Sequence, residues 1–234
     1  MMRLDALLTR YGYCSRREAA SWIKAGRCSA NGETVASPAA RADPRDVLID
    51  GRPVEFPGGL YVALNKPTGY ICSHAEPGRL VFELLPGRWS RRKPAVAMAG
   101  RLDKETSGLL LLSDDGNFIH RMTSPKSHVP KTYAFTTTAP VPAEAAALFA
   151  SGELLLEGEA KPCLPARLAL DGPCSGTLVL HEGRYHQVRR MLAAMGSPVS
   201  TLRRTRIGAL ALADLNLNEG AWTPVAPSLI APAP

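Results

Sequence analysis

Residues 99–116 read AGRLDKETSGLLLLSDDG and contain an uninterrupted run of four leucines. A short, fully apolar run bounded by turn residues is typical of a strand that is buried on both faces of a sheet. Asp114 and Asp115 directly precede Gly116, where aspartate commonly forms a turn and caps the N-terminus of the next helix. We therefore predict a buried strand at the leucine run, followed by a helix.

Asp103 stands on the other side of the leucine run and is a different kind of aspartate. It lies in a glycine-flanked loop between Arg101 and Lys104, and nearby positive charge favours the ionised carboxylate. An ionised acid on a loop at the edge of a sheet can approach a ligand. A surface ion pair is the alternative that the residues alone leave open.

A second informative stretch is HEGRYHQVRRMLAAMG, residues 181–196. His181 and His186 are five positions apart with Gly183 between them, whereas two zinc ligands on one helical face need i, i+4 spacing. A zinc site is therefore not expected. The apolar stripe of the predicted helix is formed by Val188, Met191, Leu192 and Met195. Arg189 falls at the border of this stripe, from where a guanidinium can turn inward and pair with a carboxylate.

Residues 1–57 are predicted to form a small unit of two helices and two hairpins. Leucines at helical spacing indicate the first helix, and Ser15 with Glu18 forms a capping box that begins the second. Asn31-Gly32 and Asp50-Gly51 are signals for hairpin turns. The polar face of this unit carries six basic residues, Arg3, Arg10, Arg16, Arg17, Lys24 and Arg27.

From about residue 58 to residue 223 the pattern changes to short strands that alternate irregularly with helices. YVALNKP, LLLLS, KTYAFTTT and TLVLHEG are predicted as strands, and NFIHRMTS, PVPAEAAALFASG and HQVRRMLAAMG as helices. Such a pattern predicts an α+β fold with a mixed, mainly antiparallel sheet and helices packed on it. The proline-rich residues 224–234 are predicted to fray.

The composition favours a polyanionic partner. The 234 residues carry a net charge of +7, concentrated in RWSRRK at residues 88–93 and in six arginines between residues 183 and 213. An ordinary solvated basic surface would look the same. The five cysteines include no C-x-x-C pair, which indicates reduced thiols. No apolar run approaches the ~18 residues of a membrane span, and the first residues lack a signal-peptide core, so we expect a soluble, cytoplasmic protein.

Together these motifs resemble the bacterial rRNA pseudouridine synthases. The resemblance rests on NKPTGYICS, AGRLDKETSGLLLLSDDG, HRMTSPKSHVPKTY and EGRYHQVRRMLAAMG followed by LRRTRIGALAL, in family order over nearly all of the chain. RLDALLTRYGYCSRREAASWIKAGRCSANG resembles the alpha-L RNA-binding module. ICSHAEP, TSPKSHVPKTY and GEAKP look most like the branch that modifies one uridine of small-subunit rRNA. Glu105 and Ser107 stand where the family often has Asp and Thr, and Arg189 where that branch can carry Lys.

The resemblance implies an isomerase that converts one uridine of rRNA to pseudouridine with no cofactor and no metal. Asp103 is then the essential carboxylate, Tyr133 the tyrosine that stacks on the uracil, and Arg189 the basic partner of the acid. Arg101 would fill the gap left by the flipped base, and Lys66 would be structural or contact a phosphate. The implied RNA contacts of the N-terminal module are made by Arg3, Arg16, Arg17, Lys24, Arg27 and Asn31.

Three other functions remain open at this level. A non-catalytic rRNA-binding or ribosome-assembly protein could use the same fold, but it would tolerate the loss of Asp103. The same chemistry could act on large-subunit rRNA or tRNA, and a zinc hydrolase is disfavoured by the histidine spacing. We expect a monomer that contacts no membrane. Residues 1–57 would form the alpha-L RNA-binding domain, residues 58–223 the catalytic domain, and residues 224–234 a C-terminal tail.

Overall fold

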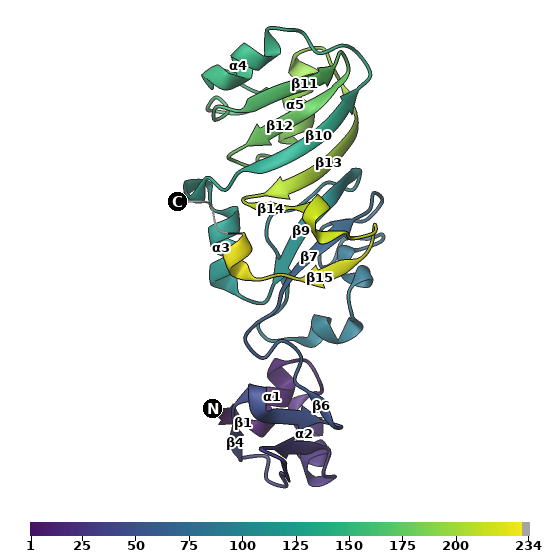
Figure 1. Cartoon of the computed structure of the whole chain (residues 1–234), viewed down its shortest axis with the longest axis vertical. Helices are drawn as coiled ribbons and strands as arrows, with labels where there is room; N and C mark the ends of the chain where they lie inside the picture. Colours follow the sequence, from purple (N-terminus) through teal and green to yellow (C-terminus); the bar gives the residue numbers. More distant parts are fainter. Residues whose placement is uncertain (231–234) are drawn as a thin grey trace.

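The computed structural model describes residues 1–230 and shows an elongated molecule with a small N-terminal unit at one end (Figure 1). This unit contains helices α1 (Leu4–Arg10) and α2 (Arg16–Lys24). Its strands form a two-stranded sheet, β1-β4, and a four-stranded sheet in the order β3-β2-β5-β6. The strand bounds are β1 Met2–Arg3, β2 Cys28–Ala30, β3 Glu33–Thr34, β4 Arg41–Ala42, β5 Val47–Ile49 and β6 Arg52–Pro53.

Local sequence signals determine the turns of this unit. The Ser15 hydroxyl accepts a hydrogen bond from the Glu18 amide at 3.3 Å, and the Glu18 carboxylate accepts one from the Ser15 amide at 2.7 Å. The predicted capping box is therefore confirmed. Both hairpin turns have two residues with positive φ, 52° and 84° at Asn31-Gly32 and 51° and 74° at Asp50-Gly51. Positive φ at both central residues defines the type I′ turn that hairpins favour.

The N-terminal unit has its own hydrophobic core. That core is made by residues between Leu4 and Val54, and the main core of the rest of the chain begins at Leu60. The domain boundary near residue 57 remains a proposal that this division supports. Across residues 1–230, no helix combines the length and the apolar character that crossing a membrane requires.

The second domain is built on a nine-stranded sheet. The main order is β11-β12-β10-β13-β9-β7-β15, with β14 paired to β13 and β8 paired to β9. Only the β13–β9 pairing is parallel among the strand pairs of this sheet in residues 1–230. The predicted α+β fold with a mixed, mainly antiparallel sheet is confirmed. The bounds are β7 Tyr61–Lys66, β8 Ala97–Met98, β9 Thr106–Ser113, β10 Lys131–Thr137, β11 Arg167–Gly172, β12 Ser175–Leu180, β13 Val199–Ile207, β14 Leu210–Ala211 and β15 Trp222–Pro224.

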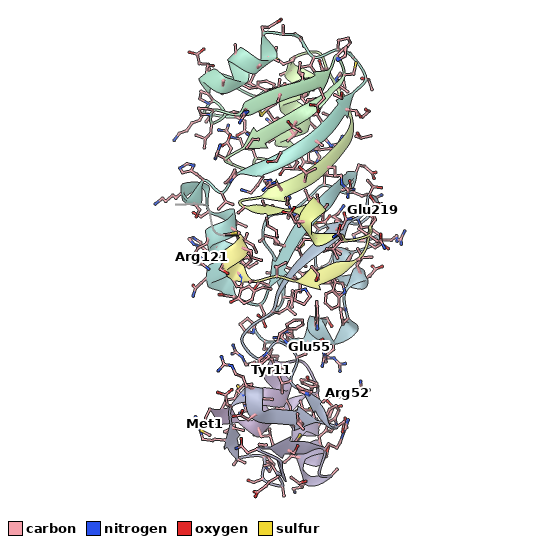
Figure 2. The ribbon with its side chains drawn as sticks, in the orientation of Figure 1. Met1, Tyr11, Arg52, Glu55, Arg121 and Glu219 are labelled. Atoms are coloured by element: carbon pink, nitrogen blue, oxygen red, sulfur yellow. The ribbon has the colours of Figure 1, made fainter. Side chains whose placement is uncertain are left out.

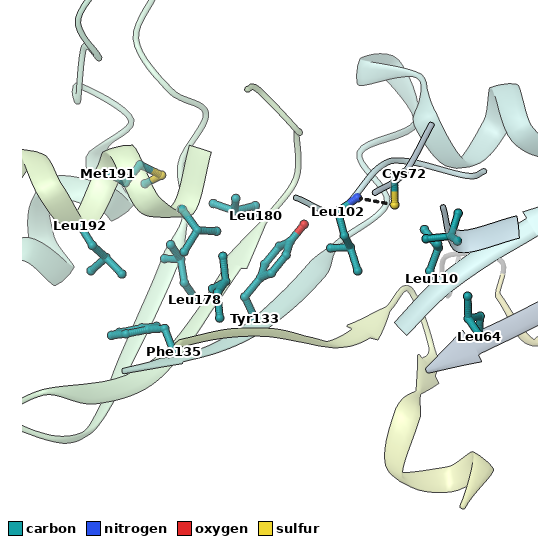
Figure 3. Packing of buried hydrophobic residues seen from close by; sticks show 14 of the residues in the cluster. Leu64, Cys72, Leu102, Leu110, Tyr133, Phe135, Leu178, Leu180, Met191 and Leu192 are labelled. Atoms are coloured by element: carbon teal, nitrogen blue, oxygen red, sulfur yellow. Dashed lines mark hydrogen bonds between the residues drawn. The ribbon is translucent and has the colours of Figure 1, made fainter. Parts of the chain in front are cut away.

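Hydrophobic clusters cover both faces of strand β9. Leu110 and Leu112 pack into the main cluster, part of which is drawn in Figure 3, whereas Leu109 and Leu111 pack on the opposite face. A strand between two cores needs apolar side chains on both faces, which explains the four-leucine run. The helices of this domain are α3 (Gly116–Thr123), α4 (Ala145–Ser151) and α5 (Gln187–Ala194).

Asp114 and Asp115 are structural, as predicted. The Asp115 carboxylate caps α3 by accepting the amides of Asn117 and Phe118. Asp114 accepts the Leu60 amide at 2.7 Å and pairs with the buried guanidinium of Arg92 through Nε at 2.9 Å. Both carboxylates therefore have structural hydrogen-bond partners where strand β9 ends and helix α3 begins.

The C-terminal tail differs from the prediction. Up to residue 230 the tail does not fray, because β15 pairs with β7 and the Val225 amide donates to the Tyr61 carbonyl at 3.0 Å. Ile230 is fully buried in the cluster on the α3 face of the sheet. Apolar anchors within the proline-rich segment outweigh its low propensity for regular structure, and the prediction was wrong for this part. Residues 231–234 lie outside the described residues.

Candidate active site

Asp103 lies on the loop that connects β8 to β9. Its side chain is 31% exposed, so it can meet a solvent-borne ligand. The loop is anchored on both sides of Asp103. The buried Leu102 donates its amide to the Cys72 sulfur at 3.4 Å (Figure 3), and the Thr106 amide donates to the Asp103 carbonyl at 3.1 Å. The carboxylate is therefore accessible while its backbone is held.

Two cationic or titratable groups from the α5 region face this carboxylate. Arg189 Nε lies 3.8 Å from Asp103 Oδ2, which is ion-pair distance but too long for a hydrogen bond. The same guanidinium donates to the Glu105 carbonyl at 3.0 Å and to the Val199 carbonyl at 3.3 Å. The predicted encounter of Arg189 with Asp103 is present, but a bidentate pair is not.

His186 is the nearer of the two groups, and the sequence reasoning considered it only as a possible metal ligand. Its Nε2 lies 3.3 Å from Asp103 Oδ1. The residue has a left-handed φ of 49° at the N-cap of α5, a conformation that is strained for side chains other than glycine. Tyr185 stacks on the imidazole at a centroid distance of 3.9 Å and is 76% exposed. His186 is the N-cap residue of α5 and Arg189 is the third residue of the helix. Side chains at these two positions commonly approach each other, so their spacing was a usable signal.

Tyr133 lies on strand β10 with its side chain on the face covered by the main cluster. It is 9% exposed, and Figure 3 shows its ring pointing toward Leu102. Leu102 directly precedes Asp103, so the tyrosine and the aspartate belong to one region of the molecule. The predicted aromatic group is therefore present beside the loop.

Lys66 does not fit the predicted RNA contact. It is 0% exposed, and its ammonium group donates to four carbonyl oxygens: Pro67 at 3.0 Å, Asp103 at 3.1 Å, Lys104 at 3.3 Å and Thr106 at 2.8 Å. Burial lowers its pKa. A phosphate contact requires an accessible ammonium, so the RNA-binding prediction is wrong and the structural alternative is supported. Lys66 holds the loop that carries Asp103.

Arg204 is a second buried cation that the sequence reasoning missed. Its Nε donates to the Leu109 carbonyl at 2.8 Å and its Nη2 to the Gly100 carbonyl at 3.4 Å, with 1% of the residue exposed. Its guanidinium also lies 6.0 Å from the centroid of the Tyr133 ring. Arg204 thus connects strand β9, the start of the Asp103 loop and Tyr133. The sequence offers no signal that separates it from its neighbouring arginines.

Gly108 allows strands β9 and β13 to meet beneath this site. It has a φ of 105°, and a Cβ atom at this position would lie 2.2 Å from the carbonyl oxygen of Arg204. A side chain here is excluded both by the backbone conformation and by the contact. The glycine of the TSGLLLL motif therefore sets the close parallel pairing that brings Arg204 under the loop.

Arg101 lies on the exposed side of the loop. Its side chain is 67% exposed and its Nη2 lies 3.3 Å from the Glu76 carboxylate, which is itself 51% exposed. An exposed ion pair of this kind contributes little and is easily exchanged. Arg101 is therefore free to move toward a nucleic acid, and its predicted role remains a prediction.

The predicted RNA contacts of the N-terminal unit divide into two groups. Arg16, Arg17 and Lys24 are exposed on α2, and none of them forms an ion pair with another of residues 1–230. Arg3 instead pairs with Asp5 at 2.8 Å. Arg27 pairs with Asp50 and also lies over the Trp22 ring, and Asn31 is exposed in its hairpin turn.

The described part of the chain holds no group of three or more His, Cys, Asp or Glu side chains placed to bind a metal ion. His181, the other histidine of the HEGRYH stretch, interacts through Nδ1 with the His128 carbonyl at 3.0 Å.

The site thus combines an accessible carboxylate, two basic side chains and a neighbouring tyrosine. Such a set can deliver a nucleophile or a base to a carbon atom and hold an aromatic base against a ring.

Comparisons with known proteins agree on one family. A family model described as RNA pseudouridylate synthase matches residues 60–162, and one described as S4 domain matches residues 2–48. The chain is 40% identical to ribosomal small subunit pseudouridine synthase A of Escherichia coli (strain K12), over 98% of this chain and 99% of that protein. It is 37% identical to the protein of the same name from Haemophilus influenzae, over 98% of each chain. A solved structure described as a pseudouridylate synthase covers 98% of both chains at 36% identity, with a TM-score of 0.68.

Proposed function

Because the chain belongs to the RNA pseudouridylate synthase family and carries an N-terminal S4 domain, we propose that it isomerises one uridine of small-subunit rRNA to pseudouridine. The family resemblance drawn from the motifs is confirmed, and the protein is a pseudouridine synthase. The choice of small-subunit rRNA is supported by similarity over nearly the full length to relatives whose names specify that subunit. The cytoplasm, where such RNA is assembled into ribosomes in bacteria, is the proposed place of action, and the monomeric state stays a prediction.

Asp103 is the proposed catalytic residue. The reaction breaks the bond between uracil N1 and ribose C1′, rotates the base, joins C5 to C1′ and moves the C5 proton to N1, so that no atom is gained or lost. An accessible carboxylate on a fixed loop can attack C1′ or remove a ribose proton. The single observation that carries this assignment is the placement of the Asp103 carboxylate within ion-pair distance of both His186 and Arg189.

His186 and Arg189 are proposed as positioning residues. Both chemical routes require the Asp103 carboxylate to be held in one position, and these two side chains approach its two oxygens separately. Arg189 also holds the Glu105 carbonyl of the same loop at 3.0 Å, so it fixes the loop and the acid together. Tyr133 is proposed to stack on the uracil, with Arg204 behind its ring. Arg101 is proposed to occupy the gap that the flipped base leaves in the RNA.

The test is Asp103→Asn, compared with Glu105→Gln as the matched control. Glu105 is an exposed acid two residues away on the same loop, so its substitution removes one negative charge without touching the proposed catalytic group. We expect Asp103→Asn to yield no pseudouridine in small-subunit rRNA transcripts while binding them with wild-type affinity. Chemical mapping of pseudouridine and a binding titration provide the two readouts. Wild-type turnover of Asp103→Asn would refute the assignment.

The same mapping decides the substrate. Total rRNA and tRNA from cells with and without the gene are compared position by position. We expect one small-subunit uridine to lose its modification. A lost site in large-subunit rRNA or tRNA instead would transfer the activity to that RNA and leave the proposed chemistry intact.

A further inference from the structure

The basic segment RWSRRK, residues 88–93, lies at the joint between the S4 domain and the catalytic domain. Within residues 1–230, two of its four basic residues are bonded to the protein through their side chains, and two are not. The guanidinium of Arg88 donates to the Glu55 carboxylate and lies 4.5 Å from the centroid of the Tyr13 ring. Arg92 is buried and pairs with Asp114. These two side chains fix the segment in place. Figure 2 labels Tyr11 and Glu55 at this joint.

Arg91 and Lys93 differ from Arg88 and Arg92 because their side chains are not held by any of residues 1–230. Both are exposed, and within residues 1–230 neither side chain forms an ion pair or a hydrogen bond with the protein. They alternate with the anchored arginines along the segment. The segment therefore presents two free cations on a fixed backbone, which reduces the entropy that a ligand must remove to bind them.

The segment packs directly against the turn between α1 and α2 of the S4 domain. The Lys93 amide donates to the Arg10 carbonyl at 2.8 Å. Gly12, with a φ of 75°, permits the contact, because a Cβ atom there would lie 2.6 Å from the Arg88 carbonyl oxygen and 3.0 Å from the Arg92 amide nitrogen. The joint is therefore a close backbone-to-backbone contact.

Positive charge from both domains meets at this contact. The pKa of Glu18 is lowered mainly by hydrogen bonds from Ser15, and the charge of Arg91 adds to this effect. The Arg91 backbone lies beside Gly12, since a Cβ atom there would be 3.2 Å from the Arg91 carbonyl carbon. Gly12 is three residues before Ser15, the N-cap of α2, and Arg16 and Arg17 are exposed on that helix. Glu18 is itself engaged in the capping box with Ser15.

We propose that the segment Arg88–Lys93 extends the RNA-binding surface of the S4 domain across the joint, with Arg91 and Lys93 contacting backbone phosphates. The joint surface is defined as Arg10, Arg16, Arg17, Arg91 and Lys93. Fixed cations from two domains can neutralise phosphates along one RNA path and so orient it toward the catalytic domain. The proposal rests on the proposed function in one respect only, that the substrate is RNA.

The experiment compares the double variant Arg91→Gln with Lys93→Gln against a charge-matched control. The control is Arg45→Gln with Arg167→Gln, two exposed arginines that lie outside the joint surface. Binding of the full-length proteins to a small-subunit rRNA transcript is titrated at several salt concentrations. Each lost phosphate contact reduces the slope of log K against log salt by about 0.7 to 0.9. We therefore expect a slope reduced by about 1.4 to 1.8 for the joint variant. If the two proteins bind equally at 1 M salt, this corresponds to an affinity roughly 25- to 60-fold weaker at 0.1 M salt.

The control variant is expected to keep the wild-type slope and turnover. A joint variant with the wild-type slope and affinity would overturn the proposal. So would weakened binding to an assembling ribosomal particle alone, which would assign the surface to a protein partner. Turnover of the wild type on the same transcript tests the proposed function separately, because the salt slope is measured without catalysis.

Discussion

Lys66→Met would remove the ammonium group that bonds to the loop carrying Asp103, while keeping an unbranched apolar side chain of similar length. The four carbonyl oxygens that accept hydrogen bonds from Lys66 Nζ lose this donor, and three of them belong to Asp103, Lys104 and Thr106. Since Lys66 is 0% exposed, water does not simply replace it. The variant therefore removes the hydrogen bonds that hold the loop and leaves the Asp103 side chain unchanged.

Two opposing effects set the magnitude. A buried acceptor without a donor costs about 1–3 kcal/mol. The Asp103 and Lys104 carbonyls still accept the amides of Thr106 and Gly69, so at most the Pro67 and Thr106 carbonyls are left without a donor, at a cost of about 2–6 kcal/mol. Methionine, however, avoids the burial of a charge, and the lowered pKa of Lys66 indicates that this burial is unfavourable. We therefore expect the free energy of unfolding to fall by about 3 kcal/mol, which lowers the Tm of a chain of this size by about 6–12 °C.

Lys104→Met is the matched control, because Lys104 is exposed on the same loop. Surface substitutions of this kind change stability by less than about 0.5 kcal/mol. Urea unfolding and pseudouridine formation are measured for both variants. We expect Lys66→Met to lose more turnover than its unfolded fraction explains, since the loop around Asp103 is no longer held. If the two variants unfold at the same urea concentration and turn over at the same rate, the hydrogen bonds of Lys66 do not support the loop and the reasoning fails.

Three further substitutions test one site residue, one close backbone contact and one buried lysine of strand β10. His186→Gly relieves the strain of a left-handed φ of 49°, so we expect the free energy of unfolding to rise by about 0.5–1 kcal/mol. Turnover should fall, because the imidazole beside Asp103 is lost. If stability and turnover changed in the same direction, a positioning role would be contradicted. Gly108→Ala meets the Arg204 carbonyl oxygen at 2.2 Å and should cost about 3 kcal/mol or more in thermal unfolding, with unchanged stability counting against the close pairing. Burial lowers the pKa of Lys131 to about 8, below the unfolded value of about 10.4, so wild-type stability should rise with pH through this window because the unfolded chain binds more protons. Lys131→Met should then be more stable at pH 7 by up to about 3 kcal/mol, an advantage that urea unfolding should show shrinking toward pH 10.4.

The elements that the sequence predicts correctly are those whose pattern has a local cause. The leucine run of β9 is apolar because both faces of the strand are buried, and α2 begins at a capping box formed within four residues. The α5 helix is recognisable from the stripe that packs on the main cluster. In each case neighbouring residues contain the whole signal, so no tertiary information is needed.

Strand β13 shows why other elements escape prediction. Three of its nine residues are arginines, Arg203, Arg204 and Arg206, and its alternation resembles an exposed polar strand. It nevertheless lies between β10 and β9, where Arg204 is buried because carbonyl oxygens of Gly100 and Leu109 accept its hydrogen bonds. Those acceptors are about a hundred positions away in the chain, and no local pattern identifies them.

The candidate site follows the same division. Asp103, Tyr133 and Arg189 are predicted from the resemblance of their motifs to a family, and the structure brings Arg189 within ion-pair distance of Asp103. Lys66 and His186 are misjudged because their roles depend on which backbone and side chain the fold places opposite them. Lys66 lies beside a motif of the site, which suggests a phosphate contact unless its burial is known. The sequence spacing of His186 disfavours a zinc site and indicates no other role, whereas the structure places its Nε2 3.3 Å from the Asp103 carboxylate.

The number of basic residues in a stretch of sequence does not predict how many of them are available to bind RNA. All six arginines between residues 183 and 213 donate hydrogen bonds to protein acceptors: Arg184, Arg189, Arg190, Arg203, Arg204 and Arg206. Two of them, Arg189 and Arg204, hold the loop that carries Asp103 through the Glu105 and Gly100 carbonyls, and the others hold parts of the chain outside that loop. The exposed cations of the joint surface, which have no such acceptors among residues 1–230, include only two from the RWSRRK segment. On the proposed assignments, RNA affinity and the position of the Asp103 carboxylate depend on different basic residues, so we expect substitutions at the joint surface to change binding without moving the carboxylate.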